Sequence, residues 1–247
     1  MSALGTSLAA FVVILGGAFL GTWLRSVLPE QHLADDTKDV VRLGTGLIGT
    51  ISALVLGLLI ASANSSYNDH SAHVQHIAAD VILLDQILAL YGPEAKPARV
   101  QLRQAIGPMV SRIWRENRSD SAYQASSAGR DFVAIILQLT PQNEAQRTLK
   151  DRAIQAVADL TQTRLLLFEQ SGGSLPLPFL VVLVFWLAMI FASFGMFSRP
   201  NPTVIAALIV CVVSASGALF LVLELSEPFA GLLQISSAAL RSALAPV

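Results

Sequence analysis

The chain has 247 residues, of which 53% are hydrophobic and only 13% are charged, and its mean hydropathy is +0.60. Soluble domains carry about 25% charged residues, so this composition excludes an ordinary soluble protein and favours a membrane protein. A net charge of −1 argues against a protein that binds nucleic acid. The single cysteine, Cys211, cannot form a disulfide within the chain.

The first apolar stretch covers residues 7–24 and predicts a membrane-spanning helix. Gly16, Gly17 and Gly21 give this helix a small face that a neighbouring helix can approach closely. Trp23 and Arg25 mark the membrane interface, where an indole and a guanidinium are favoured. No lysine or arginine precedes the stretch, so we expect a retained helix and not a cleaved signal peptide.

The second apolar stretch covers residues 43–63 and carries no charge. A face of small residues lets another helix pack closely, or it lines a narrow water-filled path, because small side chains leave room beside the backbone. The residues alone leave both roles open. The small residues that recur at spacings of three and four are Gly44, Thr45, Gly46, Gly49, Thr50, Ser52, Ala53 and Gly57.

This second helix is predicted to begin near Asp36 and to continue beyond the membrane, because no glycine or proline comes directly after Asn64, Ser65 and Ser66. The break at Gly92-Pro93 is the expected end. A helical apolar period runs through the extension at Val74, Ile77, Val81, Leu84, Ile87 and Leu88.

Three histidines, His70, His73 and His76, lie along one side of this extension at spacings of three residues. Imidazoles at such a spacing can share a metal ion such as zinc, copper or nickel. The alternatives are a polar face of the helix, or a pH-sensitive ring if the protein forms an oligomer about this helix.

The region between the second and third spans predicts an all-helical subdomain outside the membrane. Its further helices are expected at residues 97–118, 130–139 and 142–170, with periodic apolar positions that include Val100, Ile154 and Leu165. The predicted organisation has four parts: residues 1–67 for the first pair of spans, 68–171 for the helical insert, 172–225 for the second pair of spans and 226–247 for a C-terminal helix.

The third and fourth spans are predicted at residues 175–197 and 203–223. Glu224 and Glu227 follow at the edge of the apolar zone, where a carboxylate is either functional or a contact at the interface. The tail then predicts a short helix on the membrane surface or against the bundle. Its apolar residues, expected on one side, are Phe229, Leu232, Leu233, Leu240 and Leu244.

Long stretches of the chain resemble the bacterial bestrophin-like domain family. The resemblance is end to end, and its motifs stand here as HLADDTKDVVRLGTGL, SALVLGLLIASANSSY, LLDQILALYGPE, FWLAMIFASFGMFSRPN and LVLELSEPFAGLLQISSAALRSAL. The sequence departs from the family pattern at Asn64, where a lysine is frequent, and at Ser226-Glu227, where Asp-Arg is frequent.

This family is distantly similar to bestrophins, which are pentameric anion channels with four membrane helices and a pore lined by the second. The resemblance therefore implies a homo-oligomeric channel in the bacterial inner membrane that conducts small anions and needs no cofactor. Leu56 and Ile60 would form its apolar constriction. The implied pore-lining residues are Thr45, Gly49, Ser52, Leu56, Leu59, Ile60 and Asn64.

The alternative is a non-conducting membrane scaffold or sensor whose helical insert binds a partner, a proton or a metal. Arginine and lysine in the short connectors, such as Arg25 and Arg199, place those connectors in the cytoplasm and the insert outside. Bestrophins have the opposite orientation. We expect no enzyme, because the sequence shows no nucleophile–base pair, phosphate loop or zinc motif.

Overall fold

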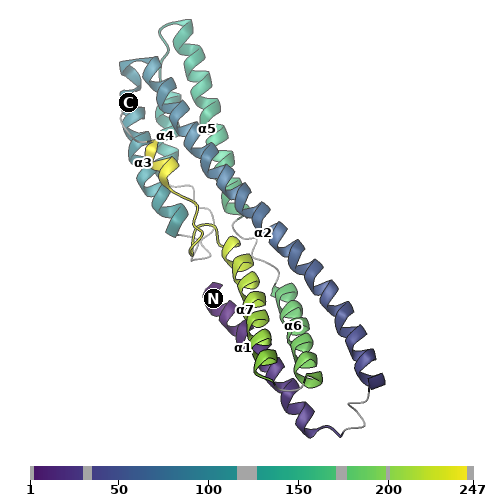
Figure 1. Ribbon diagram of the computed structural model, residues 1–247. Coiled ribbons are helices and arrows are strands. Elements are labelled where there is room, and N and C mark those ends of the chain that lie inside the picture. The colour runs from purple at the N-terminus through teal and green to yellow at the C-terminus, as the bar shows by residue number, and fades with distance from the viewer. Residues whose placement is uncertain (1–2, 30–34, 116–126, 171–176, 199–200, 244–247) are drawn as a thin grey trace. The chain divides into compact units, whose positions relative to one another are not determined.

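A computed structural model describes residues 3–29, 35–115, 127–170, 177–198 and 201–243. Every secondary-structure element in these ranges is a helix (Figure 1). Four of them are long and apolar enough to cross a membrane, in agreement with the predicted all-helical class. Arg199 of the short connector and Leu244 of the predicted tail helix lie outside the described residues.

The chain divides into two compact units, and α2 (Asp35–Tyr91) contributes to both. The first unit contains Met1–Tyr67 and Ser174–Glu227, and the second contains Asn68–Gly173 and Pro228–Val247. The long helix predicted from the missing stop signal is confirmed, and it ends where expected. Gly92 has φ +122° and ψ −170°, a conformation that glycine adopts without a Cβ clash, and Pro93 follows it.

In the first unit, α1 (Ala3–Val27) packs closely along α6 (Leu177–Phe197). Gly17 and Gly21 of α1 face the backbone of Ala188 and Ala192 of α6, and Gly195 of α6 faces the backbone of Ala18. A Cβ atom at any of these glycines would collide with a main-chain carbonyl. Two of the three glycines predicted to form the small face of α1, Gly17 and Gly21, therefore pack against α6, whereas Gly16 is exposed.

The core of the first unit lies between α1, α6 and α7 (Pro202–Leu225). Ile14 of α1 and Leu183 of α6 are almost fully buried, as are Val212 and Leu219 of α7. α7 begins with a side-chain cap, because the Asn201 side chain accepts a hydrogen bond from the Thr203 backbone N–H. The same three helices expose large apolar side chains such as Phe179 and Val213, as lipid-facing helices do.

The second unit contains the extension of α2, the short 3₁₀ turn η2 (Pro93–Ala95), α3 (Lys96–Arg115), α4 (Ser127–Gln138) and α5 (Glu144–Gln170). α4 packs against both α3 and α5. All six apolar residues predicted for the extension of α2 are buried, and they share the core with residues of the other helices. The partners include Leu102, Ile106 and Ile113 of α3, Phe132 and Ile136 of α4, and Ala153, Ala156 and Leu167 of α5.

Three apolar residues predicted on buried positions are instead exposed: Val100 at 54%, Ile154 at 38% and Leu165 at 48%. Two alanines, Ala153 and Ala156, occupy buried positions of α5. The bulky side chains of Ile154 and Leu165 lie on the exposed side of the same helix. Ile154 and Leu165 line an apolar hollow of about 490 Å³ between α4 and α5.

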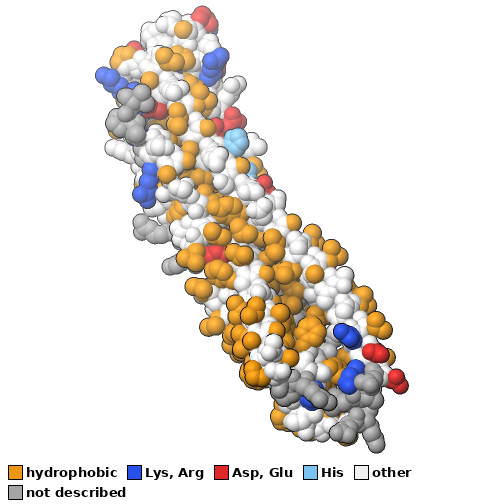
Figure 2. All heavy atoms as spheres, in the orientation of Figure 1, with side chains coloured by type: hydrophobic (Ala, Val, Ile, Leu, Met, Phe, Trp, Pro, Cys, Tyr) orange, Lys and Arg blue, Asp and Glu red, His pale blue; other side chains and the backbone are white. Residues whose placement is uncertain are grey.

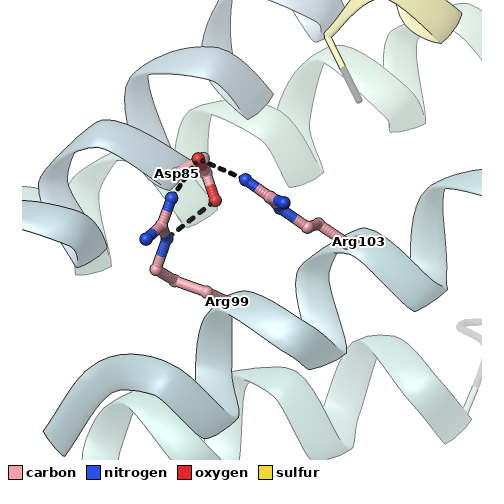
Figure 3. A network of polar contacts seen from close by, with 3 residues as sticks. All are labelled: Asp85, Arg99 and Arg103. Atoms are coloured by element: carbon pink, nitrogen blue, oxygen red, sulfur yellow. Dashed lines mark hydrogen bonds and ion pairs between the residues drawn. The ribbon is translucent and has the colours of Figure 1, made fainter. Parts of the chain in front are cut away.

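Asp85 on α2 joins the two helices that meet at the Gly92 turn (Figure 3). Arg99 on α3 donates two hydrogen bonds to its carboxylate, 3.0 Å from Nε to Oδ1 and 2.7 Å from Nη2 to Oδ2. Arg103, one turn further, donates a third at 3.3 Å. The hydrogen bond from Arg99 is the main reason that the pKa of Asp85 is lowered from its usual value.

We expect Asp85→Asn to lower the free energy of unfolding of the helical unit by about 1–3 kcal/mol at pH 7, because it removes the charge from these hydrogen bonds. A lowered pKa means that the contribution of Asp85 is present above the unfolded pKa of about 3.9 and is lost as the pH falls through the lower folded value. Thermal unfolding of both proteins across the pH range measures the difference.

The control is Glu144→Gln, which breaks the exposed ion pair between Glu144 and Arg147 and should change stability by less than about 0.5 kcal/mol. Equal melting temperatures for Asp85→Asn and the wild type at pH 7 would contradict the assignment.

Candidate pore-lining surface of helix α2

The part of α2 in the first unit is the least covered of the four membrane-length helices. Its apolar window is 11% buried within the chain, compared with 28% for α1, 28% for α6 and 17% for α7. A helix that its own chain covers so little presents most of its surface to lipid, to another copy or to a water-filled path.

The inner face of α2 packs against its own chain. Ser52, Leu59 and Ala63 are buried, and Val55 and Leu56 lie against the same core. Thr45 is half-buried and donates its hydroxyl to the Val41 carbonyl at 2.8 Å. Gly49 is also half-buried, and a Cβ atom there would lie 3.9 Å from Cδ1 of Ile190 on α6.

A second row of small and polar residues lies on the exposed side of α2, and we call it the polar stripe. Its members recur at spacings of three and four, so they share one side of the helix. A Cβ atom added at Gly46 or Gly57 would meet nothing within 4 Å, and Thr50 donates its hydroxyl to the Gly46 carbonyl at 3.0 Å. The polar stripe consists of Gly46, Thr50, Ala53, Gly57, Ala61 and Asn64, all exposed.

Bulky side chains occupy much of the exposed surface beside the polar stripe, and we call them the leucine ridge. They are Leu43, Leu47, Leu54 and Leu58, with exposed fractions from 64% to 76%. Hydrophobic side chains also cover the surface over α1, α6 and α7 in Figure 2. Exposed bulky side chains are therefore common to all four helices, and α2 is distinguished by how little its own chain covers it.

The seven residues implied as pore-lining thus fall on different sides of α2. Ile60 is exposed at 39% beside the polar stripe, and Asn64 belongs to it. Ser52 and Leu59 are buried against their own chain, which is not the position of side chains that line a path between copies. Thr45, Gly49 and Leu56 are half-buried on the same inner side. Of these seven residues, Ile60 and Asn64 are therefore the two that we consider as lining a path between copies.

The two carboxylates predicted at the membrane edge have different surroundings. Glu224 lies in the last turn of α7 and is 2% exposed, whereas Glu227 is half-buried just beyond the helix. The Glu227 backbone N–H donates to the Glu224 carbonyl at 3.2 Å. A buried carboxylate at a helix end agrees better with a contact inside the chain than with a group that meets a permeating ion.

The three histidines do not form a metal site within the described chain. His70 is 3% exposed and lies edge-on to Phe229, with ring centroids 5.7 Å apart, while His73 and His76 lie nearer the surface. Across the described residues, no group of three or more histidine, cysteine, aspartate or glutamate side chains could hold a metal ion. We carry no metal into the proposal.

The tail after α7 differs from the predicted surface helix, because α8 (Ala238–Ser242) is the only helix among its described residues, 226–243. Gly231 has φ +88°, and the Ile235 N–H donates to the Pro228 carbonyl at 2.9 Å, which closes a loop. Phe229 is buried, edge-on to Trp114, whose Nε1 donates to the Ile235 carbonyl at 3.0 Å. Pro228 and Gly231 were the signals in the sequence that could have predicted a loop.

Four membrane-length helices, one of them extended into a separate helical unit, define a multi-pass membrane protein. The model of the Bestrophin-like domain family matches residues 12–240. The chain therefore belongs to the Bestrophin-like domain family. A comparison with curated proteins found no match, and neither did a comparison with solved structures.

Proposed function

We propose that the chain forms a homo-oligomeric membrane channel that conducts small anions along an axial path lined by α2. The observation that carries this proposal is the polar stripe, which lies on the helix that its own chain covers least. Membership of the Bestrophin-like domain family supports the same reading.

The proposal requires more than one copy, because the polar stripe faces away from the helices of its own chain. In a ring of copies, the inner face of α2 packs on its own α6, the polar stripe faces the axis and the leucine ridge packs against the neighbouring copy. This arrangement gives each side of the helix the surroundings that its side chains favour. The resemblance to bestrophins makes five the expected number of copies.

The lining proposed here is neutral, since residues 43–63 carry no charge. Anions would be held by a donor with no formal charge, the Asn64 amide. Ile60, one turn before Asn64, is the apolar residue proposed to narrow the path. A neutral lining with weak donors lets an ion enter and leave, whereas a fixed arginine would hold it.

Planar-bilayer recording of the purified oligomer in a tenfold KCl gradient tests the proposal. We expect current that reverses near the chloride equilibrium potential, about 59 mV in magnitude. Reversal at the potassium potential would overturn the anion assignment. No current from an intact oligomer across pH and voltage would overturn the channel and favour a scaffold whose helical unit binds a partner.

A further inference from the structure

The apolar hollow between α4 and α5 lies at the surface of the second unit and has a volume of about 490 Å³. Its wall contains exposed bulky side chains from both helices, among them Leu137 and Ile154. The described lining residues include none with a charged side chain. Two of them are polar, Thr161 and Gln162, and Thr161 donates its hydroxyl to the Val157 carbonyl at 2.8 Å. The hollow therefore suits an apolar side chain better than an ion or a polar group.

The extension of α2 in the same unit has an outer side without charge, which we call the outer row. Among residues 71–91, no exposed residue is an aspartate, glutamate, lysine or arginine. Asp80 and Asp85 are only half-buried, but Asp85 is paired with Arg99 and Arg103. The members of the outer row recur at spacings of three and four, so they share one side of the helix. They are Ala72, Gln75, His76, Ala79, Ile82, Leu83, Gln86, Ala89 and Leu90.

Both surfaces are unusual for a helical unit in water. The solvated side of a helix normally carries charged residues, and contiguous exposed apolar patches mark interaction sites. The outer side of α5 shows the usual pattern, because it exposes Glu144, Arg147, Asp151, Arg152 and Asp159. The outer row and the apolar hollow both remain open in the single chain. A projecting row and a hollow are complementary in shape, and neither brings a charge to the other.

We propose that the outer row of one copy packs into the apolar hollow of the neighbouring copy. This contact rests on the proposed homo-oligomer and adds the surfaces that join its helical units. Leu83 and Leu90, which are 49% and 75% exposed, would enter the hollow beside Leu137 and Ile154. Burial of these side chains is favourable, because no charged group is buried with them. Since the row and the hollow are different surfaces, each copy uses one toward each neighbour, as a closed ring requires.

Leu83→Cys and Ile154→Cys in one chain test the contact, on a Cys211→Ser background and with a short bis-maleimide cross-linker in the membrane. We expect covalent products larger than dimers, because each copy is joined to two neighbours. Either cysteine alone should leave monomers. The control pairs Ile154→Cys with Val100→Cys, because Val100 is 54% exposed on α3 and lies outside both surfaces. Monomers from the Leu83 pair, equal products from the control pair, or dimers from Leu83→Cys alone would overturn the contact.

Leu90→Glu and Leu137→Glu test the same contact without a cross-linker. Both residues are exposed in the single chain, so each variant should fold and place an unpaired carboxylate in the contact. Light scattering of the purified protein in detergent measures the size of the oligomer against protein concentration. Each variant should dissociate at a concentration at least about tenfold higher than the wild type does, whereas Val100→Glu should match the wild type.

The same measurement separates this contact from the proposed oligomer itself. A wild-type oligomer with unchanged dissociation of both Leu90→Glu and Leu137→Glu would overturn the contact alone. Wild-type protein that stays monomeric at every concentration, in detergent and after cross-linking in the membrane, would overturn the proposed oligomer as well.

Discussion

Replacing Gly21 by leucine should prevent the first unit from packing. A Cβ atom at Gly21 would collide with the main-chain carbonyl of Ala192 on α6, and a backbone atom cannot turn aside as a side chain can. α1 and α6 must then separate along their whole contact. We expect a loss of at least about 3 kcal/mol, at the upper end of the range for overpacked cores, seen as a large fall in the thermal midpoint of the protein in detergent.

Gly16→Leu is the control for this variant, because it makes the same change on the same helix. A Cβ atom at Gly16 would meet nothing within 4 Å, so its leucine would face outward and the thermal midpoint should change little. Equal midpoints for Gly21→Leu and Gly16→Leu would show that the close contact between α1 and α6 does not form.

Replacing Gly57 by phenylalanine should abolish most of the current through the channel. Gly57 is an exposed member of the polar stripe, and nothing lies within 4 Å of its added Cβ. One ring from each copy would therefore fill the axial path without disturbing the fold of the chain. We expect single-channel conductance to fall at least about tenfold, because large apolar side chains dewet a narrow path.

Gly217→Phe gives the matched comparison on α7. Gly217 is also exposed, with nothing within 4 Å of an added Cβ, but it lies on a helix that the proposal places away from the axis. Its conductance should equal that of the wild type. Wild-type conductance for Gly57→Phe, from oligomers of normal size, would remove the polar stripe from the conduction path.

Much of the fold follows from patterns that are local in the sequence. Long uncharged stretches predict the membrane-length helices, because an apolar helix of about 20 residues satisfies its own backbone. The apolar period from Val74 to Leu88 predicts the buried side of the α2 extension, and Gly92 predicts its end. These features depend on the properties of single helices.

The side of α2 that packs against its own chain is harder to predict, because both of its sides carry small residues. Gly49 and Ser52 allow α2 to approach its own chain, whereas Gly46, Thr50 and Gly57 remain exposed. Composition does not distinguish a small residue that packs from one that lines a path. The distinction depends on where α6 lies, which is a property of the tertiary structure.

The tail shows the same limit. The apolar spacing from Phe229 to Leu240 resembles a helix, yet Phe229 is buried beside Trp114 while Leu232 is 78% exposed. A hydrogen bond between Trp114 and Ile235 connects residues far apart in the sequence. Such a contact has no local signal, so only the three-dimensional structure reveals it.

Disulfide cross-linking at Thr50 tests the central claim, that the polar stripe of α2 faces other copies around one axis. Cys211 is exposed, so the measurement uses Thr50→Cys on a Cys211→Ser background, with Val213→Cys on α7 as the control. We predict that mild oxidation in the membrane converts most of the Thr50→Cys chains to covalent dimers and leaves Val213→Cys monomeric. Monomeric Thr50→Cys chains, or equal cross-linking at Val213, would contradict the arrangement.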